Sequence, residues 1–296
     1  MKLINVLYEG AELPALLVLN DSAVMPLRTL LGEHAPATLL QLIQRDSPDI
    51  IVQLKHYQEH PDQATIPVDR VKILAPIPRP LRNIICLGLN YYDHVAEIID
   101  EEGNPRPVPD TPVYFSKMTS RIIGTEETIQ KHAAITDTID YEVELVAVIG
   151  KKGVNIPPAS AYDYIFGYSI LNDLTARNLQ RKHGQWMRGK SLDSFAVMGP
   201  AIVHESMFDR PPELDIQCTV NGELRQNSNT RHCIFDLPYI ISDLSKGFTL
   251  LPGDMIATGT PAGVGMGSHP PRFLRPNDSI ICTIEGIGSL VNRMEP

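Results

Sequence analysis

The sequence lacks the features that mark membrane, nucleic-acid-binding and secreted proteins. No stretch of about 18 apolar residues is present to span a bilayer. The N-terminus has no charged region followed by a long apolar run, as a signal peptide would have. The net charge of −9, without an evident cluster of Lys and Arg, argues against a nucleic-acid partner. The four cysteines show no C-x-x-C spacing, so we expect reduced core residues in a cytoplasmic protein.

A dinucleotide site and a fold of long helices are also disfavoured. The glycine-rich stretch Leu251–Gly265 is not a G-x-G-x-x-G sequence that opens a helix after a strand. The 25 prolines favour short strands and turns over long helices. With 43% hydrophobic and 21% charged residues among 296, the composition is that of an ordinary globular protein.

Three prolines within five residues indicate a boundary between two parts of the chain. Pro76, Pro78 and Pro80 make a stiff, extended linker. The residues before it show no clustered acids, histidines or glycines. We therefore predict a small N-terminal domain over residues 1–75 and a catalytic domain over residues 76–296.

The predicted site is organised around the stretch Tyr141–Gly150, whose β-branched and apolar residues predict a strand. Because successive side chains of a strand point to opposite faces, Glu142 and Glu144 share one face, with backbones roughly 6.5–7 Å apart. Two neighbouring carboxylates repel each other, and a bound hard cation would relieve that repulsion. The alternative is an edge strand whose glutamates simply meet water.

A second candidate group follows a predicted strand over residues 83–90. Asp93 can cap a short helix, on which His94 and Glu97 are three residues apart and therefore neighbours on one face. The carboxylate would stabilise the charged imidazole or orient the neutral ring as a base, unless the two form only a surface ion pair. The proline-rich loop Glu101–Pro112 is then either a lid over this pair or a solvated excursion.

Asp173 forms a third candidate, because it lies where the predicted strand Ile165–Leu171 passes into a helix. Arg177 comes four residues later and Gln180 three residues after that, so all three side chains can face one cavity. The alternatives are a plain N-cap for Asp173 and an ion pair between Arg177 and Asp173 within the helix.

Lys190 and the glycine-rich stretch Leu251–Gly265 complete the candidates. Lys190 occupies a predicted turn before an apolar strand, where a lysine is usually just solvated. The glycines let the backbone approach a ligand closely, or else form ordinary turns. Between them, Asn221-Gly222 predicts a type I′ hairpin turn.

Together these stretches resemble the fumarylacetoacetate hydrolase family, over about residues 80–296. Each is weak by itself, but the set in this order is specific. The residues that carry the resemblance are Asn90-Tyr91 with His94 and Glu97, then Tyr141 to Leu145, then Asn172-Asp173 with Arg177 and Gln180, then Gly189-Lys190-Ser191, then Gly253-Asp254 and Thr258 to Gly265.

The resemblance implies an α+β, mostly β fold: a mixed β-sandwich roll of the fumarylacetoacetate hydrolase C-terminal type, joined to a small N-terminal domain. It also implies a divalent metal held by Glu142, Glu144 and Asp173. Ligation by oxygen alone suits Mg²⁺, Mn²⁺ or Ca²⁺ better than Zn²⁺. Members are usually dimeric, so we expect a homodimer.

For the other candidates the resemblance implies roles around a 2-keto or 2,4-diketo acid. His94, oriented by Glu97, would activate water, and Lys190 would stabilise the negative charge that develops. The residues implied to hold the substrate are Arg177, Gln180 and Thr260.

The resemblance leaves the reaction open, because one scaffold supports several chemistries. We expect metal-dependent hydrolysis of a C–C bond in an acylpyruvate-type 2,4-diketo acid, which needs an activated water and a place for negative charge. The alternatives are a decarboxylase, lyase, isomerase or hydratase that uses the same metal site, and a non-catalytic binding protein that keeps the fold.

Overall fold

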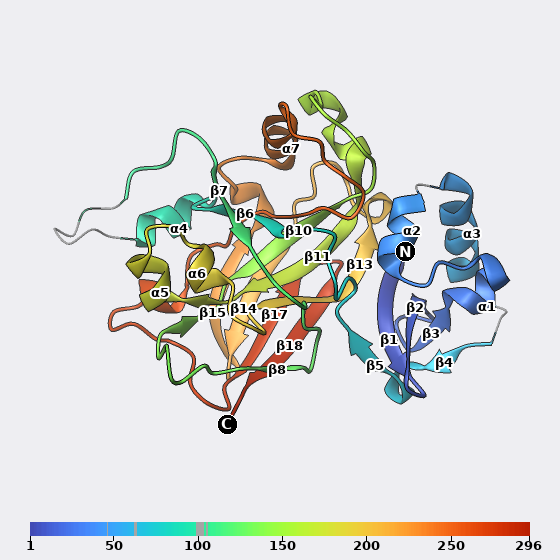
Figure 1. The fold of residues 1–296 in the computed structure, drawn as a ribbon, viewed down its shortest axis with the longest axis horizontal. Coiled ribbons are helices and arrows are strands. Elements are labelled where there is room, and N and C mark those ends of the chain that lie inside the picture. Colours follow the sequence, from blue (N-terminus) through green and yellow to red (C-terminus); the bar gives the residue numbers. More distant parts are fainter. Residues whose placement is uncertain (46, 62–63, 99–103, 105) are drawn as a thin grey trace.

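The computed structural model describes residues 1–45, 47–61, 64–98, 104 and 106–296. Within these ranges the chain forms mainly strands, with short helices around them (Figure 1). The predicted α+β, mostly β fold is confirmed.

The larger sheet has 11 strands. All its paired neighbours are antiparallel except β16 and β6, which are parallel. Its central strands β10 and β11 are buried along their whole length, as expected where both faces of a sheet are covered. In spatial order the strands are β4 (Ile66–Pro67), β3 (Ala23–Pro26), β2 (Ala11–Val18), β1 (Lys2–Tyr8), β13 (Ala196–His204), β11 (Ile165–Asp173), β10 (Val143–Ile149), β16 (Met255–Ala257), β6 (Ile84–Gly88) and β7 (Val113–Lys117), with β5 (Lys72–Leu74) paired to β1.

A five-stranded sheet packs face to face against the middle of the larger one. Val143 and Leu145 of β10 enter the shared core, together with Ile216 and Ile280 of the second sheet. The strands of the second sheet are, in spatial order, β15 (Glu223–Asn229), β14 (Asp215–Val220), β17 (Ser279–Ile284), β18 (Gly288–Met294) and β8 (Thr128–Ile129). A small third sheet joins β9 (Ile139–Asp140) to β12 (Thr175–Ala176).

The hairpin between β14 and β15 has the predicted turn. Asn221 and Gly222 both have positive φ, 52° and 79°, as a type I′ turn requires. Glycine and asparagine tolerate that conformation better than other residues, so the local sequence alone sets this connection.

The helices lie at the edges of the sandwich (Figure 1). Helices α1 to α3 lie beside the N-terminal strands, and α4, α5 and α6 lie together at the opposite side of the molecule. Their bounds are α1 (Leu27–Leu31), α2 (Leu39–Arg45), α3 (Pro48–Glu59), α4 (Tyr92–Glu97), α5 (Arg177–Lys182), α6 (Met187–Lys190) and α7 (Leu237–Ser245). No helix among the described residues is both long and apolar enough to cross a bilayer.

The larger sheet continues across the proline linker. Strand β1 pairs with β13, with Lys2 opposite Val203 and Leu3 opposite Ile202. Leu42 of α2 and Val146 of β10 belong to one buried apolar cluster. The N-terminal residues therefore cover the face of β10 that is turned away from the second sheet. The division at residue 75 stays a prediction, in a chain whose sheet and core both extend over it.

Candidate active site

The two glutamates lie at the start of β10, in the middle of the larger sheet. Strand β10 is paired with β11 on one side and with β16 on the other, so the alternative of a solvated edge strand is wrong. Glu142 directly precedes the strand and Glu144 is its second residue, and both are buried. Val143 and Leu145 point into the sandwich core, which leaves the glutamates on the opposite face, as alternation requires.

The register between β10 and β11 brings Asp173 to this face. Val143 lies opposite Asn172, and the Asp173 N–H donates to the carbonyl oxygen of Glu142 at 2.8 Å. One carboxylate oxygen each from Glu142, Glu144 and Asp173 lies within 4.8 Å of the others. The alternative role of Asp173 as an N-cap is wrong, because α5 begins at Arg177 with Ala176 as its cap residue.

Two buried lysines hold the carboxylates in place. The Lys190 ammonium lies 2.6 Å from Glu142 Oε2 and 2.7 Å from Asp173 Oδ2. Lys190 is therefore not a solvated lysine, and it ends the short helix α6 rather than occupying a turn. Lys117, at the end of β7, lies 2.6 Å from Asp173 Oδ1 and is fully buried. Sequence reasoning missed Lys117, because one lysine at the end of a short strand gives no distinguishing signal.

The surroundings of the triad shift the pKa values of its two glutamates in opposite directions. Burial by itself would raise the pKa of Glu142, but Lys190 and Arg177 outweigh burial and lower that pKa to about 2. Burial raises the pKa of Glu144 well above its ordinary value, and the neighbouring Asp173 and Glu142 raise it further. The triad thus contains one carboxylate that is firmly ionised and one whose negative charge is poorly compensated, and a bound cation would compensate it.

Arg177 connects the triad to an acid that the sequence analysis missed. Its guanidinium lies 2.7 Å from Glu142 Oε1 and 2.9 Å from Asp140 Oδ2, so the alternative of an ion pair with Asp173 within the helix is wrong. It also donates to Gln180 Oε1 at 3.1 Å. Asp140 is fully buried. The signal for it was the alternation of acids at positions 140, 142 and 144, one face of an extended chain.

His94 and Glu97 form the predicted pair on α4. His94 Nδ1 lies 2.6 Å from Glu97 Oε1, and the histidine is buried, so the pair is not a surface ion pair. The expectation that Asp93 caps this helix is wrong. Tyr91 is the cap residue, and Asp93 Oδ1 accepts instead from the His94 N–H at 2.8 Å.

The glycine-rich stretch places its backbone N–H groups on the acids of the site. Gly259 donates to Glu144 Oε2 at 3.0 Å, Gly263 to Glu97 Oε2 at 2.8 Å and Gly265 to Asp140 Oδ1 at 2.6 Å. Gly259 and Gly263 have φ values of 92° and 100°, which side chains other than glycine rarely adopt. The sequence analysis predicted that this backbone approaches a ligand closely. In the structure it approaches the side chains of Glu144, Glu97 and Asp140.

One cavity of about 580 Å³ joins most of these groups. Seven of the nine predicted site residues line it, namely His94, Glu142, Glu144, Arg177, Gln180, Lys190 and Thr260. Asp173 and Glu97 lie behind this lining, each bonded to a lining residue. The Thr260 hydroxyl donates to the Val143 carbonyl at 2.9 Å and accepts from Gln226, so the framework already engages it.

The predicted lid, Glu101–Pro112, is described only in part. Residues 101–103 and 105 lie outside the described residues. Arg106 lines the cavity, and its backbone N–H donates to the Ile98 carbonyl at 2.9 Å. The role of this loop as a lid stays a prediction.

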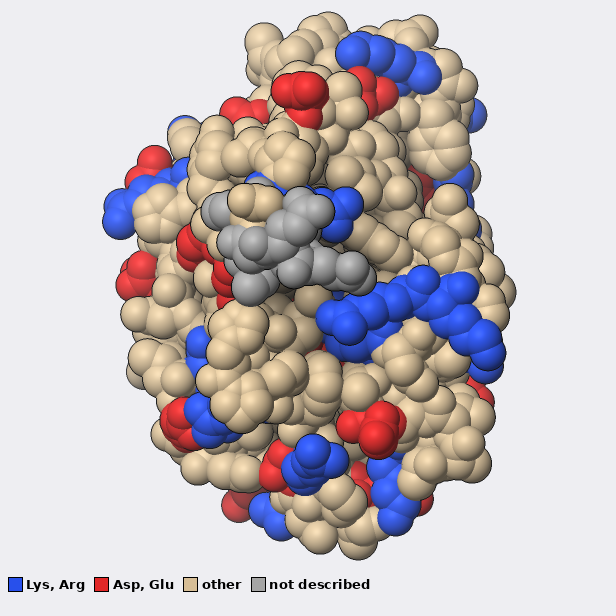
Figure 2. Space-filling view, turned by 90° about the vertical axis from the view of Figure 1, so that its left-hand side faces the viewer, with Lys and Arg blue, Asp and Glu red and all other residues tan. Residues whose placement is uncertain are grey.

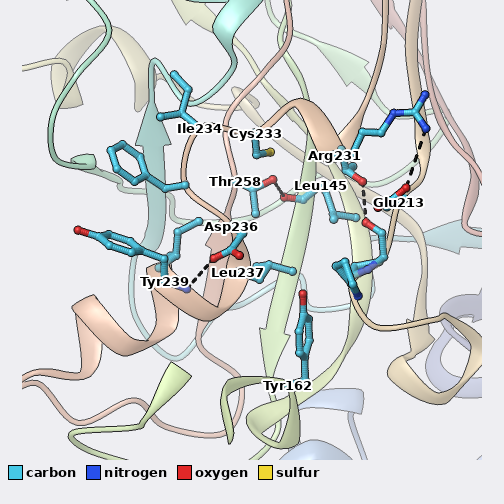
Figure 3. Close-up of a pocket in the computed structure, with 15 residues that line it drawn as sticks. Leu145, Tyr162, Glu213, Arg231, Cys233, Ile234, Asp236, Leu237, Tyr239 and Thr258 are labelled. Atoms are coloured by element: carbon cyan, nitrogen blue, oxygen red, sulfur yellow. Dashed lines mark hydrogen bonds and ion pairs between the residues drawn. The ribbon is translucent and has the colours of Figure 1, made fainter. Parts of the chain in front are cut away.

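A second cavity, of about 480 Å³, lies on the other face of β10 (Figure 3). Leu145 and Thr258 line it, next in sequence to Glu144 and Gly259 of the site. Its charged groups include Arg231 and Glu213, which form an ion pair at 3.9 Å, and it contains no member of the triad. The chemistry-bearing groups therefore gather in the first cavity.

The donor set of the triad fits a hard divalent cation. Its ligands are carboxylate oxygens alone, which suit Mg²⁺, Mn²⁺ and Ca²⁺. The Lys190 ammonium already bridges Glu142 and Asp173, so the site accommodates positive charge at this point. Glu144 is buried next to two other carboxylates, which disfavours its ionised form. A further positive charge, such as a bound cation, would stabilise that form.

Comparison with known proteins relates the chain to a family of enzymes. The family model described as fumarylacetoacetate (FAA) hydrolase C-terminal matches residues 83–295. The oxaloacetate tautomerase YisK of Bacillus subtilis (strain 168) is 47% identical over 227 residues, which are 77% of this chain and 74% of that protein. The mitochondrial oxaloacetate tautomerase Fahd2a of Rattus norvegicus is 41% identical over 230 residues, 77% of this chain and 71% of its own.

A solved structure extends the likeness to the whole chain. The fumarylacetoacetate hydrolase (EaFAH) from psychrophilic Exiguobacterium antarcticum superposes with a TM-score of 0.85 at 38% identity, covering 100% of this chain and 99% of that one. The N-terminal strands and the sandwich are therefore both part of a known arrangement. The predicted fold type is confirmed.

Proposed function

Because the chain belongs to the fumarylacetoacetate hydrolase family, we propose that it is a divalent-metal-dependent enzyme that interconverts the keto and enol forms of a 2-keto acid such as oxaloacetate. Family members act on keto acids, and the tautomerases named above favour tautomerisation over C–C hydrolysis. The observation that carries the proposal is the buried triad of carboxylates, two of which line the same cavity as His94.

Tautomerisation requires a base at C3 and compensation of charge at the C2 oxygen. When bound at the triad, a divalent cation would act as a Lewis acid on the keto and carboxylate oxygens of the substrate. His94 takes the C3 proton, because an imidazole whose Nδ1 donates to Glu97 carries its free lone pair on Nε2. Proton transfer to the C2 oxygen completes the enol, with no change in the carbon skeleton.

The remaining groups bind and orient the substrate. Lys190 supplies a fixed positive charge close to the carbon skeleton, held by Glu142 and Asp173. Arg177 and Gln180 present hydrogen-bond donors from the first turns of α5. Glu97 is itself fixed by the Gly263 N–H, so the base keeps one orientation between turnovers.

C–C hydrolysis of an acylpyruvate is the second candidate, supported by the same His94–Glu97 pair and by the description of the Exiguobacterium structure as a hydrolase. In that reaction His94 would activate water. The water oxygen adds to the C4 carbonyl, the C3–C4 bond breaks, and the electron pair and a proton end on C3 to give pyruvate and a second acid.

The test follows oxaloacetate in D2O by NMR, with protein stripped by EDTA and then loaded with Mg²⁺, Mn²⁺ or Ca²⁺. We expect metal-dependent exchange of the C3 protons with an intact skeleton. His94→Gln should slow this exchange by about 100- to 10,000-fold, the range for loss of a general base. The exposed His60, changed to Gln, is the matched control and should exchange as the unaltered protein does.

Two outcomes would decide against tautomerisation. Release of pyruvate and a second acid from acetylpyruvate, at a rate exceeding C3 exchange, would make hydrolysis the function. Exchange unaffected by EDTA, in protein shown by elemental analysis to be metal-free, would contradict the metal dependence of both candidates.

A further inference from the structure

The segment that carries α5 and α6 is strongly basic in an otherwise acidic chain. From Arg177 to Lys190 it holds five Lys or Arg residues and His183, with no Asp or Glu, whereas the whole chain has a net charge of −9. The sequence analysis overlooked this run because only Arg181 and Lys182 are adjacent in it, while its other Lys and Arg residues are separated by neutral residues. In Figure 2, which faces the side of the molecule where α4, α5 and α6 lie, a broad group of Lys and Arg side chains lies together.

The cations of this segment fall into two groups by their partners. Arg177 and Lys190 are buried and are bonded to acids of the site. Arg181 is exposed, lines the same cavity and has no ion-pair partner among the described residues. Lys182, next in sequence, is exposed but does not line the cavity. Arg181 is thus a guanidinium at the cavity with its donors available.

Helix α5 places Arg181 outward from the triad. Arg177, Gln180 and Arg181 are related by three and four residues, so they share one face of the helix. Four residues of helix advance about 6 Å along its axis. A substrate that is bound at the triad by its keto-acid end and extends along this face therefore meets Arg181 at its other end.

The rest of the cavity entrance also constrains that end. Arg106 lines the cavity as a second exposed guanidinium. Phe115 and Trp186 form an aromatic wall, with ring centroids 5.4 Å apart and the Trp186 ring packed against Gly88. The entrance thus combines cationic donors with a rigid apolar wall, which suits a short chain ending in an anion.

We propose that Arg181 binds a second carboxylate of the substrate, and so selects 2-keto dicarboxylates over 2-keto monocarboxylates. This inference rests on the proposed function and specifies its substrate class. A guanidinium binds a carboxylate through two parallel hydrogen bonds, and the surrounding positive charge attracts dianions to the entrance.

The test compares oxaloacetate with a monocarboxylate 2-keto acid, 2-ketobutyrate, in the C3 exchange assay with metal-loaded protein. Arg181→Met should raise KM for oxaloacetate by about tenfold or more, the size expected for a lost charge-assisted hydrogen bond. The preference for the dicarboxylate should shrink accordingly, and Arg181→Lys should restore part of it. Lys182→Met, the adjacent control, should retain the preference.

Binding provides a second readout that does not depend on turnover. Oxalate occupies only the keto-acid end, so calorimetry should give Arg181→Met an oxalate affinity close to that of the unaltered protein. An unchanged oxaloacetate preference in Arg181→Met would overturn the inference and leave the proposed function intact. Absence of exchange with both substrates in the unaltered protein would instead refute the proposed function.

Discussion

At the scale of single residues, Lys117 is a group outside the predicted set that contacts the triad directly. Its ammonium is fully buried, 2.6 Å from Asp173 Oδ1, and donates to the carbonyl oxygens of Leu174, at 3.0 Å, and Lys190. Burial lowers the pKa of Lys117, and the nearby Asp173 offsets that effect only in part. Lys117 therefore joins three segments of chain at the triad. Its ion pair with Asp173 offsets part of the free-energy cost of burying the ammonium group.

Lys117→Met should destabilise the protein strongly, because it leaves the buried Asp173 with one cation fewer. Removing one partner of a buried ion pair costs about 3–5 kcal/mol. Urea unfolding followed by circular dichroism, with EDTA present, measures the loss. Added Mg²⁺ should recover part of it by supplying positive charge at the triad.

The exposed Lys72, changed to Met, is the control for loss of a lysine charge and should alter the free energy of unfolding by less than about 0.5 kcal/mol. A similarly small loss in Lys117→Met would show that Asp173 does not depend on this cation.

At the scale of elements, the site is held by contacts between the ends of elements. Strand β6 ends at Gly88, where the absence of a side chain admits the Trp186 ring that precedes α6. A Cβ atom at Gly88 would lie 2.0 Å from the Trp186 Cζ3 atom. The same contact sets the position of the aromatic wall at the cavity entrance, so close packing here determines the shape of the site.

Gly88→Ala should displace Trp186 from this wall and cost about 1–3 kcal/mol by overpacking. The protein contains one tryptophan, so fluorescence reports on this ring alone. We expect the emission maximum to move to longer wavelength as Trp186 becomes more exposed to water.

Trp186→Ala provides the matched background for this test. Without the ring, Gly88→Ala should cost much less stability than it does in the unaltered protein, as a double-mutant cycle would show. An equal cost in both backgrounds would locate the strain elsewhere.

At the scale of the whole molecule, His204 lies at the junction between the N-terminal strands and the sandwich. Its backbone N–H donates to the Met1 carbonyl at 2.9 Å, and its ring meets Phe166 edge-on at 5.3 Å. Burial, with a further contribution from Lys55, lowers the pKa of His204 from its ordinary 6.5 to about 4. The folded protein therefore holds this ring neutral over a pH range in which the unfolded chain protonates it.

This difference predicts a loss of stability in acid. Because the unfolded chain binds more protons between pH 6.5 and about 4, stability falls as pH falls through this window, by up to about 3 kcal/mol. His204→Gln should lose this part of the pH dependence, since glutamine does not titrate. Urea unfolding at a series of pH values measures it, and an unchanged acid slope in His204→Gln would contradict the assignment.

The sequence determined the features that depend on near neighbours in the chain. Alternation along one strand put Glu142 and Glu144 on one face, and three-residue spacing put His94 against Glu97. The Asn221-Gly222 turn followed from the backbone preferences of its own two residues. These predictions held because the geometry of a strand, a helical turn or a hairpin fixes such contacts locally.

Only the tertiary structure decided which distant segments meet. The register of β10 with β11 delivered Asp173 to the glutamates, and the end of β7 delivered Lys117 to Asp173. Arg177 bonded to Asp140 rather than to Asp173, and β1 extended the larger sheet past the proline linker. Register and packing arise from many small contributions spread over the whole core, and no short stretch of sequence contains them.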